Sequence, residues 1–316
     1  MMKAKTSVLL AMSALLLTAI CWGLAPVATR YLLQSLSPIA FLLIRFILAS
    51  LLFLPFIFRR TKEGWSRRYL LLAVAGGLVG TIGYYAAVTF GLQWISAGTA
   101  GLLLATEPLW IALFSLLLLH DRLRLSILCG LVLALLGVAL LVGGTLLSPM
   151  LHITTVIGMG LTLFSAIMWG LYTIIVRPIS QRYGAFTCTA ITTIIGTIPL
   201  LTLWPPDLLS VGLHLDLAGW IALVLLTVGS TIIATILWNY GVARLPGAQA
   251  GAFLYLVPLF SVLGGAIFLH EPVTLDLLIS GLLIIGGVIV TQLPSIWQQS
   301  HHAIDKSKVQ PTTVTD

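Results

Sequence analysis

Charged side chains are scarce in this sequence. Aspartate and glutamate together number 9, lysine and arginine number 16, and these four types make up 8% of the 316 residues. Soluble globular domains carry about 25% charged residues. With 59% hydrophobic residues and a mean hydropathy of +1.11, the chain has too little polar surface to face water on every side. We therefore expect a polytopic membrane protein.

Motifs of enzymes and nucleotide-binding proteins are also missing. No Walker A, HExxH, GxSxG or dinucleotide-type GxGxxG sequence stands in a suitable context. The cysteines Cys21, Cys129 and Cys188 form no CxxC pair, and His301-His302 is too sparse for a metal site. The sequence thus supports no ATPase, peptidase or cofactor enzyme, and we expect no catalytic residue, cofactor or metal. The net charge of +7 reflects short basic loops rather than a nucleic-acid partner.

The sequence instead contains apolar runs long enough to cross a bilayer. A spanning helix needs about 20 mostly apolar residues, and ten segments meet that length. We therefore predict an all-α integral membrane protein with ten transmembrane helices. The predicted spans are 7–29, 38–58, 69–90, 98–119, 125–145, 153–176, 185–204, 217–238, 247–269 and 274–293.

Basic residues predict the orientation of these spans. With the N-terminus inside, every lysine and arginine except Arg30 and Arg45 falls in a cytoplasmic segment, which is the side that basic residues favour. The sequence thus predicts a multi-pass protein of the cell (inner) membrane with both termini in the cytoplasm. The polar tail, residues 294–316, is expected to be a disordered cytoplasmic segment.

Two stretches of the first half recur in the second half. "CWGLAPVATR" (21–30) matches "MWGLYTIIVR" (168–177) at an offset of 147 residues, the separation of Trp22 and Trp169. "FGLQWISAGTAGLLLATEPL" (90–109) matches "YGVARLPGAQAGAFLYLVPL" (240–259) at an offset of 150, the separation of Pro108 and Pro258. We infer one duplication with a small insertion.

The duplication divides the chain into a first repeat, residues 1–146, and a second repeat, residues 147–293, with five predicted spans each. An odd number of spans makes the second copy enter the membrane from the opposite side. Inverted repeats of this kind are a common construction of secondary transporters, because two similar halves in opposite orientation can exchange conformations around one site.

These residues resemble the EamA-type transporters of the drug/metabolite transporter superfamily. The resemblance lies in "WGLAPVATR" (22–30), "IRFILA" (44–49), "EPLWIALFSLLLLHDRL" (107–123) and the second copy "VPLFSVLGGAIFLHEPVTLDLLISGLLIIGGVIV" (257–290). It implies a ten-helix bundle with a central cavity that moves small metabolites by alternating access, often outward. The expected substrates are amino-acid-like or other small organic solutes. His120-Asp121 and His270-Glu271 depart from the usual Gly-Glu pattern, and we expect them only to form solvated helix ends near the interface.

Two other classes of function stay open. A membrane-embedded enzyme needs clustered acids or histidines at one depth, and Glu107 is the only acid in the interior of a predicted span, since Asp276 lies at the start of the last one. A channel or a scaffold protein is disfavoured by the inverted duplication. The expected partners are a small-molecule substrate and membrane lipid, and glycine-rich helix faces leave a homodimer open.

Arg45 and Glu107 are the charged candidates for a substrate cavity. Counted along their predicted spans at 1.5 Å per residue, they lie about 10 and 13 Å from the same membrane face. We predict that they face one interior space and interact directly or through water. Arg45 either binds an anionic group of the substrate or ties its helix to carbonyls or to Glu107. Glu107 is either the counterion of Arg45 or a proton-coupling site.

Aromatic residues and prolines complete the expected site. Tyr84, Tyr85 and Tyr255 are predicted to line the cavity because they lie deep in their spans. Trp22 and Trp169 are equivalent in the two repeats. We assign both to the same cavity, and a shared structural role is the first interpretation. Pro108 and Pro258 interrupt equivalent helices, either as kinks or hinges near the site or as residues tolerated for packing.

Overall fold

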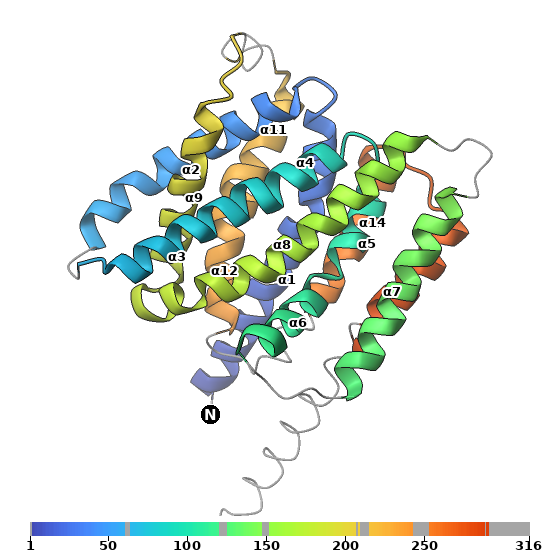
Figure 1. The fold of residues 1–316 in the computed structure, drawn as a ribbon, viewed down its shortest axis with the longest axis horizontal. Helices are drawn as coiled ribbons and strands as arrows, with labels where there is room; N and C mark the ends of the chain where they lie inside the picture. Colours follow the sequence, from blue (N-terminus) through green and yellow to red (C-terminus); the bar gives the residue numbers. More distant parts are fainter. Residues whose placement is uncertain are drawn as a thin grey trace, which may run out of the picture.

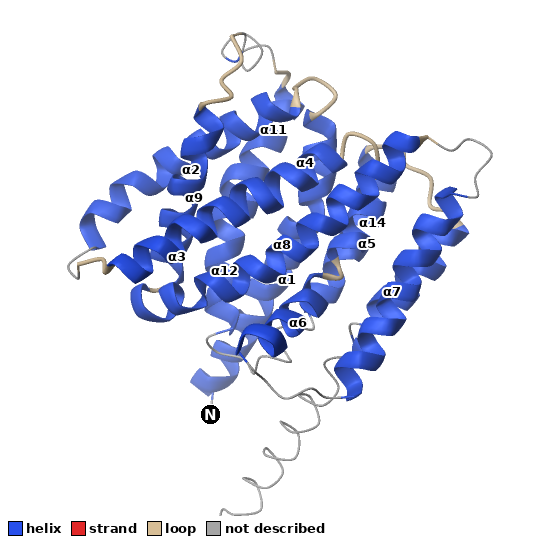
Figure 2. Cartoon of the chain, in the orientation of Figure 1, coloured by secondary structure: helices blue, strands red, loops and turns tan. Residues whose placement is uncertain are grey.

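The computed structural model describes residues 2–60, 64–119, 125–146, 152–206, 208, 215–242, 253–287 and 289–290. Over these ranges the protein is helical, without a strand (Figure 2). Five helices are long and apolar enough to cross a membrane: Leu9–Leu32, Pro38–Pro55, Arg67–Gly91, Ile153–Tyr183 and Leu217–Trp238. Shorter apolar helices cover Val132–Leu141, Phe186–Leu201, Leu256–Phe268 and Leu275–Gly287. The predicted tail, 294–316, lies outside the described residues.

The helices form one elongated bundle (Figure 1). Many leucines on its surface are exposed, Leu217 to 78% and Leu282 to 75% for example, and such an apolar exterior suits lipid rather than water. In chain order the elements are α1 (Met2–Leu32), α2 (Pro38–Arg60), α3 (Arg67–Gly77), η1 (Leu78–Ala86), α4 (Ala87–Gly91), α5 (Ala97–Leu104), α6 (Glu107–Leu119), α7 (Leu125–Leu146), α8 (Ile153–Tyr183), α9 (Ala185–Leu201), α11 (Leu217–Val224), η2 (Leu225–Ile233), α12 (Ala234–Val242), η3 (Phe253–Tyr255) and α14 (Leu256–Phe268). A further helix, Leu275–Gly287, follows α14.

Two of the long helices contain a π-helical segment in the middle. α3, η1 and α4 run on as one helix, and so do α11, η2 and α12. The first residue of η2, Leu225, follows the first residue of η1, Leu78, at the same offset of 147 that separates Trp22 and Trp169. Short π-helical stretches are rare and occur often at functional sites. No pattern in the sequence predicts them.

The predicted fourth span is two helices rather than one kinked helix. α5 ends at Leu104, Ala105 and Thr106 form a turn, and α6 begins at Glu107. Pro108 is therefore the second residue of α6, where its missing N–H leaves no hydrogen bond unmade. In the second half the 3-10 helix η3 precedes α14, and Pro258 is the third residue of α14. Both prolines thus lie at the start of a helix.

Close glycine contacts join the two halves of the chain. A Cβ atom added to Gly23 of α1 would lie 2.5 Å from Phe260 Cβ of α14. The equivalent Gly170 of α8 meets α6 in the same way, since its Cβ would lie 2.7 Å from Trp110 Cβ. Only glycine allows these helix backbones to approach so closely. The long first helix of each half therefore packs against the helix that begins near a proline in the other half.

At one side of the bundle α7 lies against the last described helix, Leu275–Gly287 (Figure 1). A Cβ atom on Gly287 would lie 2.6 Å from Ala134 N, and one on Gly137 would lie 2.8 Å from Ile284 Cγ1. Each helix therefore contributes a glycine to the contact. The core elsewhere includes Phe41 and Phe46 of α2 packed with Leu226 at the start of η2, so α2 holds the π-helical segment from one side.

Candidate functional site

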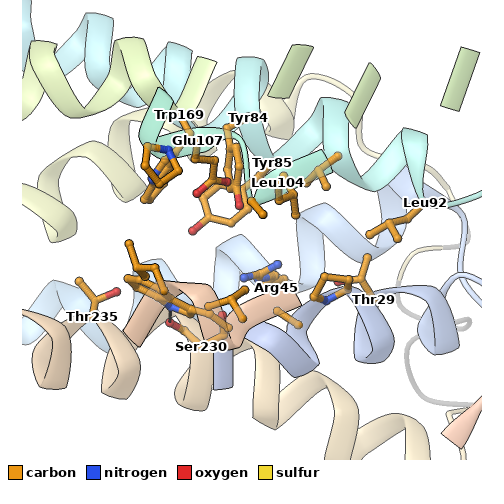
Figure 3. A pocket seen from close by; sticks show the side chains of 18 residues that line it. Thr29, Arg45, Tyr84, Tyr85, Leu92, Leu104, Glu107, Trp169, Ser230 and Thr235 are labelled. Carbon is orange, nitrogen blue, oxygen red and sulfur yellow. Dashed lines mark hydrogen bonds between the residues drawn. The ribbon is translucent and has the colours of Figure 1, made fainter. Parts of the chain in front are cut away.

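A cavity at the centre of the bundle is lined by residues from α1, α2, η1, α6, α8, η2 and α12 (Figure 3). The described side chains that the sequence assigned to a cavity all line it: Trp22, Arg45, Tyr84, Tyr85, Glu107 and Trp169. Pro108 lies on the same wall, whereas Pro258 does not line the cavity although its neighbour Val257 does. The side chain of Tyr255 lies outside the described residues. The site is thus built from helices of both halves.

Arg45 of α2 is buried, with 4% of its surface exposed. Its Nη2 donates a hydrogen bond to Thr231 Oγ1 of η2 at 3.1 Å, and its Nε finds no hydrogen-bond partner in the described part of the chain. The guanidinium carbon lies 4.9 Å from the ring centre of Tyr85 and within 6 Å of two phenylalanine rings, Phe46 at 5.7 Å and Phe41 at 5.9 Å. Cation–π attraction to these rings lowers the energy of a charge in an apolar bundle.

Glu107, the first residue of α6, lies on the wall formed by α6, α8 and η1 (Figure 3). Its carboxyl group hydrogen-bonds the Tyr84 hydroxyl. The Tyr84 ring packs against Tyr85 with centroids 4.8 Å apart and against Trp169 with centroids 4.7 Å apart. These ring contacts fix the position of the Tyr84 hydroxyl, so the carboxyl group has a defined neighbour.

Arg45 and Glu107 both line the cavity, and the described residues include no ion pair between them. Tyr84 and Tyr85 connect the two charged groups, since Tyr84 bonds Glu107 and Tyr85 faces Arg45. The depths of Arg45 and Glu107 along their predicted spans cannot predict this arrangement, because the two tyrosines come from a third helix. The cavity therefore holds one guanidinium and one carboxyl group, each with a partner of its own.

Each equivalent tryptophan contacts the π-helical segment of the other half. Trp22 of α1 donates through Nε1 to the Ser230 carbonyl of η2 at 3.2 Å, and its ring lies 5.6 Å from that of Trp238. Trp169 of α8 packs against Tyr84 of η1 instead. The residues of η1 and η2 share little similarity, so the repeat pattern gave no signal for these segments or for Thr231.

A second cavity continues from the first toward the C-terminal end of α8. The two share Trp22, Tyr85, Glu107, Pro108, Trp169, Thr235 and Leu254. Figure 1 shows this end of α8 on the same side of the bundle as the start of α1. The lining of this second cavity becomes polar toward that end of α8. Its polar residues are Thr81, Thr173, Arg177, Ser180, Gln181, Thr189, Thr192 and Thr193.

At the opposite end of the bundle, above Thr29 and Leu92 of the central cavity, the helices are joined by a cluster that we call the Arg30–Glu271 cluster. Arg30 Nε lies 2.8 Å from Glu271 Oε1. The same carboxylate accepts from the backbone N–H of Ala97 at 2.8 Å, at the start of α5. Arg30 also donates to the carbonyl oxygens of Leu92, at 2.9 Å, and Ile95. The cluster ties the ends of α1 and α4 to the start of α5 and to the loop after α14.

The expectation of a solvated helix end at Glu271 is wrong, since only 11% of its side chain is exposed. The first N–H groups of α5 attract a carboxylate, and Gly265 leaves room for it, since a Cβ there would lie 2.5 Å from Glu271 Oε2. His120-Asp121, the equivalent pair, lies outside the described residues. Within the described part of the chain, no group of three or more His, Cys, Asp or Glu side chains is placed to hold a metal ion.

The model of the EamA-like transporter family matches residues 9–143 and again residues 156–293. The chain belongs to this family. It is a transmembrane protein of a transporter family, not an enzyme, as its sequence predicted. The two matches cover the cavity residues of both halves.

Curated relatives span nearly the same length. A protein of Archaeoglobus fulgidus called an uncharacterized transporter is 30% identical over 88% of this chain and 97% of its own. A protein of Streptantibioticus cattleyicolor called a probable terminal-alkyne amino-acid exporter is 28% identical over 88% of this chain and 91% of its own. One solved crystal structure, 22% identical, superposes with a TM-score of 0.59 over 93% of this chain and 99% of that chain. This last likeness shows the fold alone.

Proposed function

We propose that the protein is a secondary transporter that exports small organic solutes across the cell's inner membrane by alternating access. The observation that carries the proposal is a cavity with charged and hydroxyl groups inside an apolar bundle, continuous toward one end and bridged by the Arg30–Glu271 cluster at the other. A polar cavity inside apolar helices is needed to carry a polar solute through lipid.

The mechanism requires two halves that exchange roles. We propose ten helices in two inverted five-helix repeats, residues 1–146 and 147–293. Support comes from the two family matches, from the offset of 147 between η1 and η2, and from the reciprocal contacts of Gly23 with α14 and Gly170 with α6. The helix starts at Pro108 and Pro258 are where we expect the halves to bend, because Pro108 follows the turn at Ala105 and Thr106 and Pro258 follows the 3-10 segment η3.

The distribution of lysine and arginine supports an orientation with both termini in the cytoplasm. Arg177 and Gln181 then lie at the cytoplasmic mouth of the cavity, and the Arg30–Glu271 cluster closes the outer end. The proposed cycle loads solute from the cytoplasm in this arrangement, and export requires the cluster to separate. The name of the Streptantibioticus cattleyicolor relative supports outward movement and an amino-acid-like cargo.

The test is flux in liposomes that contain the purified full-length protein. Vesicles are loaded with radiolabelled amino acids, amines, organic acids or nucleosides, one class at a time, and protein-free vesicles give the leak rate. We expect saturable efflux of at least one class and acceleration when the unlabelled solute is present on the other side. That acceleration requires a site exposed alternately to the two sides. Flux that neither saturates nor accelerates indicates a channel, and flux no faster than the leak for every class contradicts transport.

A further inference from the structure

Arg45 has few partners for a charged group in a buried position. A guanidinium carries five N–H donors and always bears its charge. In the described part of the chain, one hydrogen bond is formed, to Thr231, while the buried Nε has no partner and no carboxylate lies within ion-pair distance. Charged groups buried in this way are normally paired or hydrogen-bonded. The open donors of Arg45 therefore point to an anion that is absent when the site is empty.

The surroundings of Arg45 hold it without neutralising it. The faces of Tyr85, Phe46 and Phe41 lie between 4.9 and 5.9 Å from the guanidinium carbon. Aromatic faces attract a cation but do not replace the in-plane, two-oxygen acceptor that a carboxylate offers to a guanidinium. Arg45 also lines the cavity, so a solute in the cavity can supply that acceptor.

Thr231 sets the direction of the guanidinium. Its hydroxyl donates to the Leu226 carbonyl at 2.9 Å, five residues earlier, which is the spacing of the π-helical turn. Because the single hydroxyl proton is used there, Oγ1 is left as an acceptor for Arg45 Nη2, at 3.1 Å. The π-helical segment thus places a fixed acceptor beside Arg45, and Thr231 is a positioning residue.

A carboxyl group lies on the facing wall of the same cavity. Glu107 has the Tyr84 hydroxyl as its neighbour, and no described cation pairs with it. A solute between the walls therefore meets a cation on one side and a carboxyl group on the other. Trp22 and Trp169 add aromatic surface to the lining, which suits the apolar side chain of a solute whose two charged groups face Arg45 and Glu107.

Resting on the transport function proposed above, we propose that the cavity binds a neutral amino acid with an apolar side chain. Its carboxylate is held by Arg45, oriented by Thr231, and its ammonium group faces Glu107. The recognised chemistry is the zwitterion, so a solute that lacks either charge loses one half of the site.

The test uses isothermal titration of the purified full-length protein with three matched probes. L-Leucine carries both charges, isoamylamine is leucine without the carboxylate, and 4-methylpentanoate is leucine without the ammonium group. We expect leucine to bind and each single-charge probe to bind at least about tenfold more weakly, since charge-assisted hydrogen bonds are lost.

Variants of the π-helical segment separate recognition from folding. Thr231→Val should weaken leucine and 4-methylpentanoate binding by about tenfold and leave isoamylamine binding unchanged, whereas Thr231→Ser should restore leucine binding. The matched control is Thr227→Val on the same segment, because the buried Thr227 hydroxyl has no described partner and does not line the cavity. Thr227→Val should leave the binding of all three probes unchanged.

The outcomes discriminate between the two proposals. Absent leucine binding, or binding of either single-charge probe as tight as that of leucine, overturns the zwitterion site. Equal loss of all three probes in Thr231→Val overturns the role of Thr231 in carboxylate binding. If liposomes still show saturable, accelerated flux of amines, organic acids or nucleosides, the transport function stands while the zwitterion site fails.

Discussion

The two π-helical segments occupy equivalent places in the chain and differ in the side chains that they present to the cavity. η1 presents Tyr84 and Tyr85, a ring wall whose hydroxyl reaches Glu107. η2 presents the Ser230 carbonyl to Trp22 and the Thr231 hydroxyl to Arg45. The two halves thus share the π-helical backbone, whereas the side chains that it carries differ between them. Similar helices can support similar motions of the two halves, while the side chains that recognise the solute differ between the halves.

If the halves are equivalent in packing, blocking either helix contact should have the same severe effect. Gly23→Leu and Gly170→Leu each insert a side chain where even a Cβ atom would lie 2.5 and 2.7 Å from a neighbour. We expect both variants to lose the folded protein, because overpacking costs about 1–3 kcal/mol or more and the neighbours include backbone atoms. Size-exclusion chromatography of the solubilised protein measures the amount of folded protein.

The control for the glycine variants is Gly160→Ala, since a Cβ on Gly160 of α8 meets nothing within 4 Å. It should give normal yield and a single symmetric peak. A stable, monodisperse Gly23→Leu protein beside an unfolded Gly170→Leu protein would contradict the equivalence of the two contacts.

The next largest effect is expected on the acidic side of the cavity. Glu107→Gln keeps the size of the side chain and removes its charge, so we expect leucine flux in liposomes to fall at least about tenfold, as when a charged hydrogen-bond partner is lost. Isoamylamine binding should fall as well, while 4-methylpentanoate binding should not. Leucine transport at the original rate, with its original response to a pH gradient, would exclude Glu107 both from ammonium binding and from proton coupling.

The end of the bundle that carries the Arg30–Glu271 cluster offers a test of the difference between the two ends. Glu271→Gln removes the ion pair with Arg30, a contact expected to contribute about 1.5–3 kcal/mol as a charged hydrogen bond. A Thr29→Cys reporter beneath the cluster, in a chain without its three native cysteines, should then react about tenfold faster with a membrane-impermeant thiol reagent added outside cells.

Asp276→Asn is the matched control for Glu271→Gln, because Asp276 follows the same loop but is exposed. It should leave the labelling rate of the reporter at the level of the parent chain. Equal rates for Glu271→Gln and Asp276→Asn would show that the cluster does not limit access from that side.

The smallest effect is expected at Tyr84. Tyr84→Phe keeps the ring contacts with Tyr85 and Trp169 and removes only the hydroxyl that bonds Glu107. We expect leucine affinity to fall only a few-fold, because the carboxyl group keeps its place at the start of α6. Titration calorimetry measures the change, and a loss as large as that of Glu107→Gln would mean that the hydroxyl itself contacts the solute.

The sequence predicted the family, the membrane class and the cavity side chains better than it predicted their contacts. A lone charge such as Arg45 in an apolar run, or Glu107 in another, is visible because hydrophobic surroundings make charge expensive. Tyr84 and Tyr85 were predicted in the cavity, but their contacts with Glu107 and Arg45 could not be predicted, because those contacts depend on three helices. The π-helical segments repeat in position but not in residues, and Arg30 and Glu271 lie near opposite ends of the chain, so no local spacing connects them.

The contact between α7 and the helix Leu275–Gly287 also has a consequence for evolution. Gly137 faces Ile284, and Gly287 faces Ala134, with no space for a larger atom at either glycine. The atoms nearest to the two added Cβ positions include the backbone atoms Ile284 N and Gly130 O, which no change of the facing side chain removes. Among homologous sequences we therefore expect glycine to be kept at positions 137 and 287, whatever the side-chain volume at positions 284 and 134.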